Sequence, residues 1–193
     1  GVVCIVRKLI NTLNTLELEK DLINACLQND RIAQRKLYQA YASRMLVVCA
    51  RYAPSKAEAE DILQEAFIKI FQNLSSFRGE STIGAWIKRI VINTAIKHIR
   101  SQQPWQDMSD VAEFENHFSD KGTSIEGIHF QELLAMIHKL PKGCQTVFNL
   151  YAIEGYQHHE IAEMLGISEG TSKSQYSRAR QLLQAQLSYD KVG

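Results

Sequence analysis

The stretch 157–187 carries a stripe of polar side chains whose chemistry suits DNA binding. If its second half is one helix, Lys173, Ser174, Ser177 and Arg178 lie on one side of that helix. In a major groove, short hydroxyl side chains allow close approach, and an arginine can bind guanine through two hydrogen bonds. The same residues also suit the solvated face of an ordinary surface helix, because helix-turn-helix hairpins occur in proteins that bind no DNA.

A tight turn is expected to join two helices within this stretch. Gly166 permits the positive φ that ends a helix, and Ser168 can cap a second helix that starts at Glu169. The inward stripe of that second helix, at spacings of four, three and four, is Ser172, Tyr176, Ala179 and Leu183. This is a helix-turn-helix pattern. His158 and His159 open the first helix, and because they point about 100° apart we interpret both as surface residues.

A second amphipathic helix follows the capping box formed by Ser55 and Glu58. Its inward stripe consists of Ala59, Ile62, Leu63, Ala66, Phe67 and Ile70. The opposite side places one apolar residue, Ile68, among the acidic and amide residues Asp61, Gln64 and Glu65. Such a face is a candidate docking patch for a basic partner helix, and the plainer alternative is a solvated acidic surface.

A third helix is expected from about residue 82 to 101, with Ser81 as its cap. Most of its circumference is apolar, but one stripe breaks the pattern at spacings of three, four, four and three: Trp86, Arg89, Asn93, Lys97 and Arg100. An aromatic ring, an amide and three cations in a row can stack on a base, bind a base edge and bind phosphates. The alternative for Trp86 is packing in the core.

The charges of the chain are unevenly distributed. The 193 residues have a net charge of only +1. Five basic residues and one acid between 78 and 102 give that segment +4, whereas six acids and one lysine between 103 and 126 give the next segment −5. The first segment should attract phosphate and the second should repel it.

The sequence carries no pattern of catalysis, metal binding or membrane insertion. The four cysteines form no CxxC pair and are interpreted as free thiols in a reducing compartment. We find no HExxH motif, nucleophile motif or phosphate-binding glycine loop, so no catalytic, cofactor or metal site is expected. No apolar run approaches the ~20 residues of a membrane span, and a cytoplasmic protein is expected.

These patterns predict an all-α protein of two small helical domains joined by a flexible acidic linker. The expected segments are an N-terminal extension at 1–16, a helical domain at 17–102, the linker at 103–126, and a helix-turn-helix domain at 127–193. Further helices are expected at 17–28, from Asp30 to a stop at Pro54, from about 125 to 140, and at 145–153.

Three motifs, in this order, resemble signatures of the extracytoplasmic function (ECF) subfamily of bacterial sigma factors, the promoter-specificity subunits of RNA polymerase. They are AEDILQEAFIKIF, then FRGEST with AWIKRIVINTAIKHIR, then LPKGCQTVFNLYAIEGYQHHEIAEMLGISEGTSKSQYSRAR. The resemblance covers nearly everything from Leu18 to Leu187. It implies a noncatalytic protein that binds core polymerase, recognises and melts promoter DNA, and starts transcription.

The resemblance also assigns roles to the polar faces. It implies that Asp61, Gln64, Glu65 and Ile68 dock on the β′ clamp coiled coil of the polymerase. It places Ser81, Thr82, Trp86, Arg89, Asn93 and Lys97 on minus-ten DNA, and Thr171, Lys173, Ser174, Ser177 and Arg178 on minus-thirty-five DNA. The expected partners are core RNA polymerase, including its β flap, promoter DNA and an anti-sigma factor, and the linker would thread the polymerase cleft.

Two departures from the family pattern bear on specificity. Trp86 is followed by Ile87 where housekeeping relatives carry more aromatic residues, which predicts less forgiving melting. Ser172 stands where a small apolar residue is commoner.

The alternative function is a stand-alone helix-turn-helix regulator, which leaves the faces around Asp61 and Trp86 without a purpose.

Overall fold

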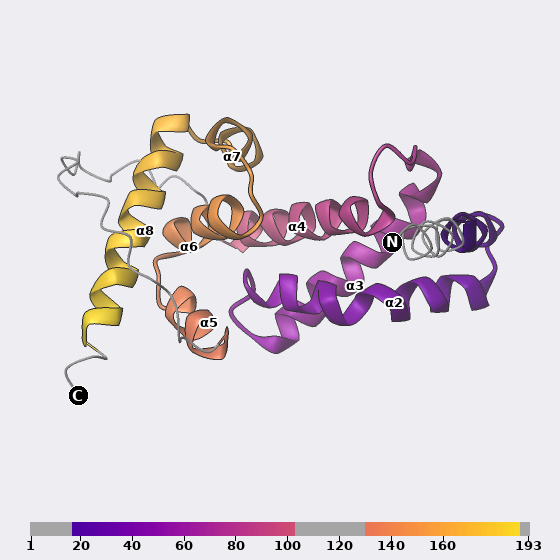
Figure 1. Ribbon diagram of the computed structural model, residues 1–193, viewed down its shortest axis with the longest axis horizontal. Helices are drawn as coiled ribbons and strands as arrows, with labels where there is room; N and C mark the ends of the chain where they lie inside the picture. The colour runs from indigo at the N-terminus through magenta and orange to yellow at the C-terminus, as the bar shows by residue number, and fades with distance from the viewer. Residues whose placement is uncertain (1–16, 103–129, 190–193) are drawn as a thin grey trace, which may run out of the picture. The chain divides into compact units, whose positions relative to one another are not determined.

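The computed structural model describes residues 17–102 and 130–189, and every regular element in them is helical (Figure 1). The expectations for the N-terminal extension and the acidic linker therefore lie outside the described residues. The chain divides into two compact units. The first contains the described residues up to 49 with Glu60–Thr94, and the second contains Ala50–Ala59 and the described residues from 95 onward.

The first unit draws on four helical segments: residues 17–27, α2 (Arg31–Ala50), α3 (Lys56–Asn73) and α4 (Ile83–Gln102). Asp30 caps α2 as expected, since its Oδ1 accepts hydrogen bonds from the backbone N–H groups of Ile32 at 2.8 Å and Ala33 at 3.3 Å. Ser55 caps α3 as expected, with the Glu58 N–H donating to Ser55 Oγ at 3.2 Å.

The cap of α4 differs from the expectation. Thr82, not Ser81, is the capping residue, because its Oγ1 accepts a hydrogen bond from the Ala85 N–H at 3.2 Å. The helix begins one residue later than predicted, so the residue immediately before it moves from Ser81 to Thr82.

The core of the first unit is aliphatic and forms along the inward stripes of α3 and α4. Its fully buried side chains include Ile62, Ile70, Ile83, Ile87, Val91 and Ile92. Gly84 lets α2 and α4 approach closely, since a Cβ at this position would lie 3.0 Å from Cε1 of Tyr41. The six apolar positions predicted to face inward on α3 are all buried.

The second unit contains α5 (Phe130–His138), α6 (Lys142–Phe148), the π-helical turn η3 (Asn149–Ile153), α7 (His158–Leu165) and α8 (Glu169–Tyr189). The long helix α8 packs against α5, α6 and α7 (Figure 1). Its core cluster consists of Met136, Ile137, Leu140, Cys144, Ala179 and Leu183. The helix predicted at 145–153 begins earlier, at Lys142, directly after Pro141, and its last part is π-helical.

Two polar side chains of α6 and η3 donate hydrogen bonds to the backbone of Arg51 inside the second unit. The Arg51 carbonyl accepts hydrogen bonds from Gln145 Nε2 at 3.0 Å and from Asn149 Nδ2 at 2.9 Å. Its guanidinium is paired with the carboxylate of Glu154, and both side chains are buried. Since an unpaired buried charge is costly, each of these two groups depends on the other.

Three of the four cysteines, Cys26, Cys49 and Cys144, are buried free thiols as predicted, and Cys4 lies outside the described residues. Within 17–102 and 130–189, no helix combines the length and apolar character that crossing a membrane requires.

Two isoleucines of α3 separate core packing from surface exposure. Ile62 is fully buried and Ile68 is 58% exposed. Ile62→Ala should lower the free energy of unfolding by about 2 to 5 kcal/mol, because it removes buried methyl groups and leaves a cavity. Ile68→Ala, the matched control, should change it by no more than about 0.5 kcal/mol. Urea denaturation measures both, and equal losses would contradict the assigned orientation of α3.

Candidate nucleic-acid interface

The turn between α7 and α8 is built as the sequence predicts. Gly166 has φ +68°, and its N–H donates to the Ala162 carbonyl at 2.9 Å, which closes the last turn of α7. Ser168 Oγ then accepts a hydrogen bond from the Thr171 N–H at 2.9 Å, so α8 begins at Glu169. This local chemistry fixes the point from which α8 projects.

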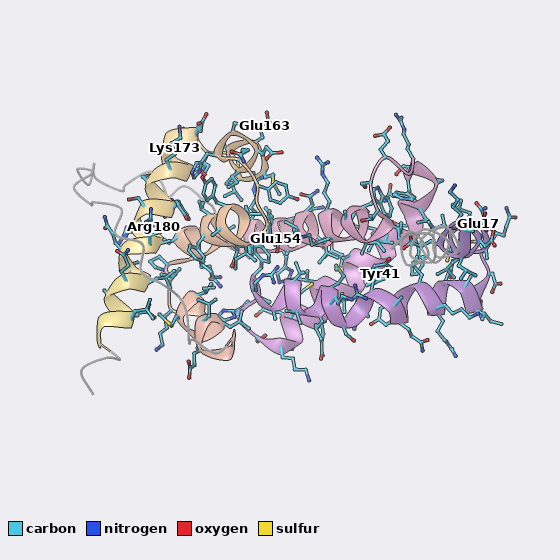
Figure 2. All side chains as sticks on the ribbon, viewed as in Figure 1. Glu17, Tyr41, Glu154, Glu163, Lys173 and Arg180 are labelled. Atoms are coloured by element: carbon cyan, nitrogen blue, oxygen red, sulfur yellow. The ribbon has the colours of Figure 1, made fainter. Side chains whose placement is uncertain are left out.

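One side of α8 presents the recognition face, which we define as Thr171, Lys173, Ser174, Ser177 and Arg178. Lys173 and Arg178 are exposed, and the three hydroxyl residues are half-buried. Figure 2 shows Lys173 on the N-terminal part of α8. Two long cations flanking short hydroxyl side chains match the demands of a DNA groove, where phosphates and base edges lie at different depths.

Lys173 is held by a neighbour on its own helix. Its Nζ lies 2.7 Å from Glu169 Oε1, and both side chains are largely exposed. This hydrogen bond with Lys173 is the main cause that lowers the pKa of Glu169. An exposed ion pair of this kind exchanges readily, so the ammonium remains available to a phosphate.

The opposite side of α8 is buried and includes polar groups. Ser172 and Ala179 are fully buried, and Leu183 also lies in the core, as predicted. Gln175 is buried too, which helical periodicity did not predict. Its Oε1 accepts a hydrogen bond from Cys144 Sγ of α6 at 3.0 Å. Burial raises the pKa of the Cys144 thiol, which keeps it protonated as the donor.

His158 is half-buried against α8, which corrects its interpretation as a surface residue. Its Nδ1 lies 2.9 Å from Ser172 Oγ, and its ring stacks on Tyr151 with centroids 4.2 Å apart and 13° between the planes. Burial, followed by the nearby Lys173 ammonium, lowers the pKa of His158. His159 is exposed as predicted.

The polar stripe of α4 is open to solvent along much of its length. Arg89, Asn93, Lys97 and Arg100 are all exposed. Trp86 is half-buried, so part of its side chain packs inside the unit and part of it contacts solvent. An exposed amide and cations on one helix face suit binding to nucleic acid.

The loop before α4 contributes an aromatic residue that the stripe pattern of α4 did not predict. The ring of Phe77 packs against Trp86 with centroids 5.6 Å apart and planes tilted by 57°. Ser81 and Thr82 are exposed beside the start of α4. An aromatic pair next to exposed hydroxyl groups is a platform on which a base can stack. The signal was the single Phe77 in an otherwise polar loop.

The α3 acidic face, which we define as Asp61, Gln64, Glu65 and Ile68, is exposed at all four positions. Glu65 pairs with Lys69 across one helical turn at 2.6 Å, and Lys69 Nζ also donates to Thr94 Oγ1 at 3.3 Å. The large exposure of Ile68 shows that the apolar residue stands on the outside, as the sequence predicts. Acids around one apolar residue suit a basic, partly apolar partner.

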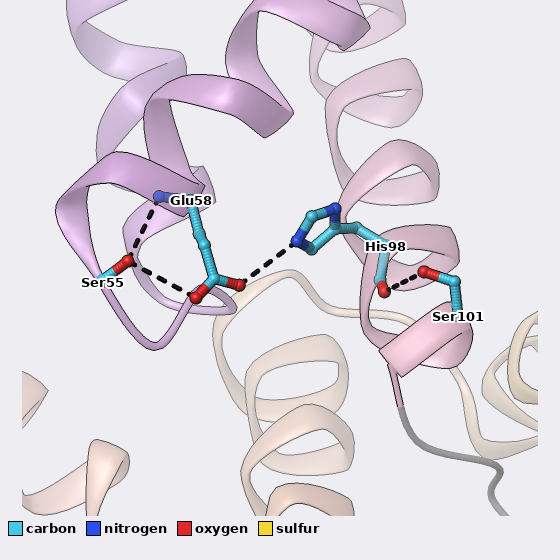
Figure 3. Close-up of polar contacts among 4 residues, drawn as sticks. All are labelled: Ser55, Glu58, His98 and Ser101. Atoms are coloured by element: carbon cyan, nitrogen blue, oxygen red, sulfur yellow. Dashed lines mark hydrogen bonds and ion pairs between the residues drawn. The ribbon is translucent and has the colours of Figure 1, made fainter.

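A serine, glutamate and histidine cluster in the second unit superficially resembles a catalytic triad (Figure 3). His98 Nε2 lies 3.3 Å from Glu58 Oε2, and Ser55 Oγ lies 3.5 Å from Glu58 Oε1. Ser101 Oγ donates to the His98 backbone carbonyl at 2.7 Å. These serine contacts go to a carboxylate and a carbonyl, whereas activation of a serine nucleophile requires its hydroxyl to meet the imidazole.

Metal ligands are not gathered at any of these faces. In the part of the chain that the structure describes, no group of three or more His, Cys, Asp or Glu side chains is arranged to hold a metal ion.

Two segments of the chain each match a known protein family. Residues 37–104 match the Sigma-70 region 2 family, and residues 130–183 match the Sigma-70 region 4 family. The ECF RNA polymerase sigma-E factor of Escherichia coli (strain K12) is 30% identical over 173 residues, which cover 84% of this chain and 90% of the relative. This chain belongs to the ECF family of RNA polymerase sigma factors.

A second sequence relative agrees with this assignment, and a solved structure has a similar fold. The RNA polymerase sigma-H factor of Pseudomonas aeruginosa is 29% identical over 180 residues, covering 88% of this chain and 93% of the relative. The fold is similar to that of the sigma factor RpoE from Bartonella quintana, solved in complex with the anti-sigma factor NepR. That match has a TM-score of 0.52 at 21% identity and covers 81% of this sigma factor and 97% of the solved chain.

The lowered pKa of His158 predicts a pH-dependent contribution to stability. Because the pKa of His158 in the folded chain lies below the ordinary value of 6.5, the unfolded chain takes up this proton at a higher pH than the folded chain does. The contribution of His158 is therefore complete above about pH 6.5 and is lost as the pH falls toward its folded pKa. The difference in unfolding free energy between wild type and His158→Asn should be smaller at about pH 5.5 than at about pH 7.5. An equal or larger difference at the lower pH, measured by urea denaturation, would contradict the assigned shift.

Proposed function

We propose that this sigma factor uses its three exposed faces for three separate tasks in transcription initiation. The α3 acidic face binds core RNA polymerase, the α4 stripe with its preceding loop binds the minus-ten element, and the recognition face of α8 binds the minus-thirty-five element. The observation that carries this proposal is the exposure of Ile68 among acids on α3, because a protein that only bound DNA would gain nothing from that face.

Docking through α3 is favoured by charge and by shape. Asp61, Gln64 and Glu65 surround Ile68 on a helix whose other side is fully committed to the core. The buried side fixes the direction in which the helix presents these four side chains, so little backbone entropy is lost on binding. The proposed partner surface is the clamp coiled coil of the β′ subunit, and the β flap is the proposed partner of the second unit.

Minus-ten recognition is assigned to Ser81, Thr82, Trp86, Arg89, Asn93 and Lys97. Extruding a base from the duplex costs a few kcal/mol, which the protein must offset by stacking and hydrogen bonds. Trp86, backed by Phe77, supplies a stacking surface, and Asn93 supplies an amide for a base edge. Arg89 and Lys97 are exposed cations for the phosphates.

Minus-thirty-five recognition is assigned to the recognition face. Arg178 is exposed and has the geometry to bind guanine with two hydrogen bonds, and Lys173 can bind a phosphate. Thr171, Ser174 and Ser177 are short enough to let the α8 backbone approach the base edges.

This proposal makes the protein a noncatalytic factor that works in the cytoplasm, where polymerase and promoters are. An anti-sigma factor is a proposed partner as well, and the sigma factor of Bartonella quintana was solved with one. The acidic sequence 103–126 is proposed to thread the polymerase cleft, because its charge imitates that of nucleic acid.

Binding measurements separate this function from that of a stand-alone DNA-binding regulator. A sigma factor should bind core polymerase tightly and free promoter duplex weakly. Tight, sequence-specific binding to duplex DNA with no affinity for core polymerase would instead favour the stand-alone regulator.

Asp61→Arg tests the docking face. The substitution places a cation opposite a basic partner, so affinity for core polymerase should fall at least about tenfold, equivalent to about 1.4 kcal/mol. Asp21→Arg, an exposed acid outside the α3 acidic face, is the matched control and should leave affinity within about twofold. Fluorescence anisotropy with purified core enzyme measures both. Unchanged affinity of the Asp61 variant would remove this face from the interface.

Arg178→Ala tests readout by α8. Loss of a two-hydrogen-bond contact to guanine should cost about 1 to 3 kcal/mol on the cognate promoter and much less on a promoter changed at that base pair. Arg180→Ala is the matched control, since Arg180 is exposed two positions further along the same helix and therefore points away from Arg178. Holoenzyme binding to the two promoters gives the comparison. An equal loss on both would make Arg178 a phosphate contact.

A further inference from the structure

The recognition helix is anchored at its N-terminal end by a buried hydroxyl group. Ser172 is 0% exposed and lies between Thr171 and Lys173, two members of the recognition face. A hydroxyl group buried without a partner costs about 1 to 3 kcal/mol. Here the partner is Nδ1 of His158, at 2.9 Å, from the first turn of α7.

His158 is itself fixed by aromatic rings from two other elements. Its ring is stacked on Tyr151 of η3 and lies edge-on to Tyr176 of α8, with centroids 6.0 Å apart and planes at 60°. Tyr151 and Tyr176 also touch each other, at 4.6 Å between centroids. The imidazole therefore connects η3, α7 and α8 at one point.

We infer that His158 is a positioning residue for promoter readout, which sets the rotation of α8 about its axis through Ser172 and so selects the base pairs that the recognition face reaches. This inference rests on the proposed function of α8. A rotation of about 10° displaces a side chain at a radius of about 5 Å by about 1 Å, using the dimensions of an α-helix. Hydrogen bonds to base edges do not tolerate such a displacement.

The apolar packing of α8 does not provide the same control. Ala179 and Leu183 lie two and three turns further along the helix, and apolar contacts are not directional. Gln175 bonds to Cys144 of α6, which fixes a neighbouring turn against a different helix. The contact between His158 and Ser172 is a directional link that joins α8 to α7 beside the recognition face.

The test uses holoenzyme, assembled from the full chain and core polymerase, on promoters with a randomised minus-thirty-five element and a fixed minus-ten element. Sequencing the transcripts gives the base preference at each position. His158→Phe keeps an aromatic ring and removes the hydrogen-bonding nitrogen. His158→Asn keeps a polar atom near the Nδ1 position and removes the ring. Ser172→Ala removes the hydroxyl group from the other side of the contact.

His158→Phe and Ser172→Ala should each change the preference at one or more positions by at least threefold. The double variant should change it no more than the larger single effect, since both substitutions remove the same contact. His158→Asn should change it less than His158→Phe. His159→Asn, at the exposed neighbouring position, should leave every preference within twofold.

Preferences within twofold for both single variants would overturn the inference, as would effects that multiply in the double variant. A uniform loss of transcription across all promoters, with unchanged preferences, would also overturn it and leave His158 a purely stabilising role. If His158→Phe does not fold, Ser172→Ala alone decides the question by the same threefold criterion. Failure of the wild-type protein to direct any promoter-dependent transcription would instead reject the proposed function.

Discussion

The burial of one narrow stripe of α8 against α6 and α7 is the constraint on which the proposed readout depends. Ser172, Gln175 and Ala179 are buried. Ser172 contacts His158, Gln175 contacts Cys144, and Ala179 packs in the apolar core. Because side chains follow one another at about 100° around a helix, fixing this stripe leaves Lys173 and Arg178 outside. The recognition face is thus a geometric consequence of what lies behind it.

The same principle governs α3 and α4 in the first unit. The fully buried isoleucines of these helices commit one side of each to the core, so their other sides are presented rigidly to solvent. On α3 that side carries acids around Ile68, and on α4 it carries an amide and cations beyond the half-buried Trp86. The proposed function depends on this difference in charge, since an acidic face suits a basic protein surface and a basic face suits nucleic acid.

Helical periodicity was enough to predict the parts of the fold that depend on local sequence. It predicted the inward stripe of α3, the exposure of Ile68 and the turn at Gly166 and Ser168. It chose the wrong cap for α4, because Ser81 and Thr82 are adjacent and equally able to cap. It also missed the burial of Gln175 and the contacts of His158, since their partners lie on other helices and turns, and no spacing rule reports such contacts. The extension and the linker remain predictions.

The most direct test of the account is genome-wide mapping of run-off transcription start sites with purified core polymerase, in the presence and absence of this protein. If this protein reads two promoter elements, new, protein-dependent starts will appear whose upstream sequences share two motifs at a fixed spacing, one for each DNA-binding face. The absence of any new start with a matched core enzyme, once a copurified inhibitory partner has been excluded, would contradict the account.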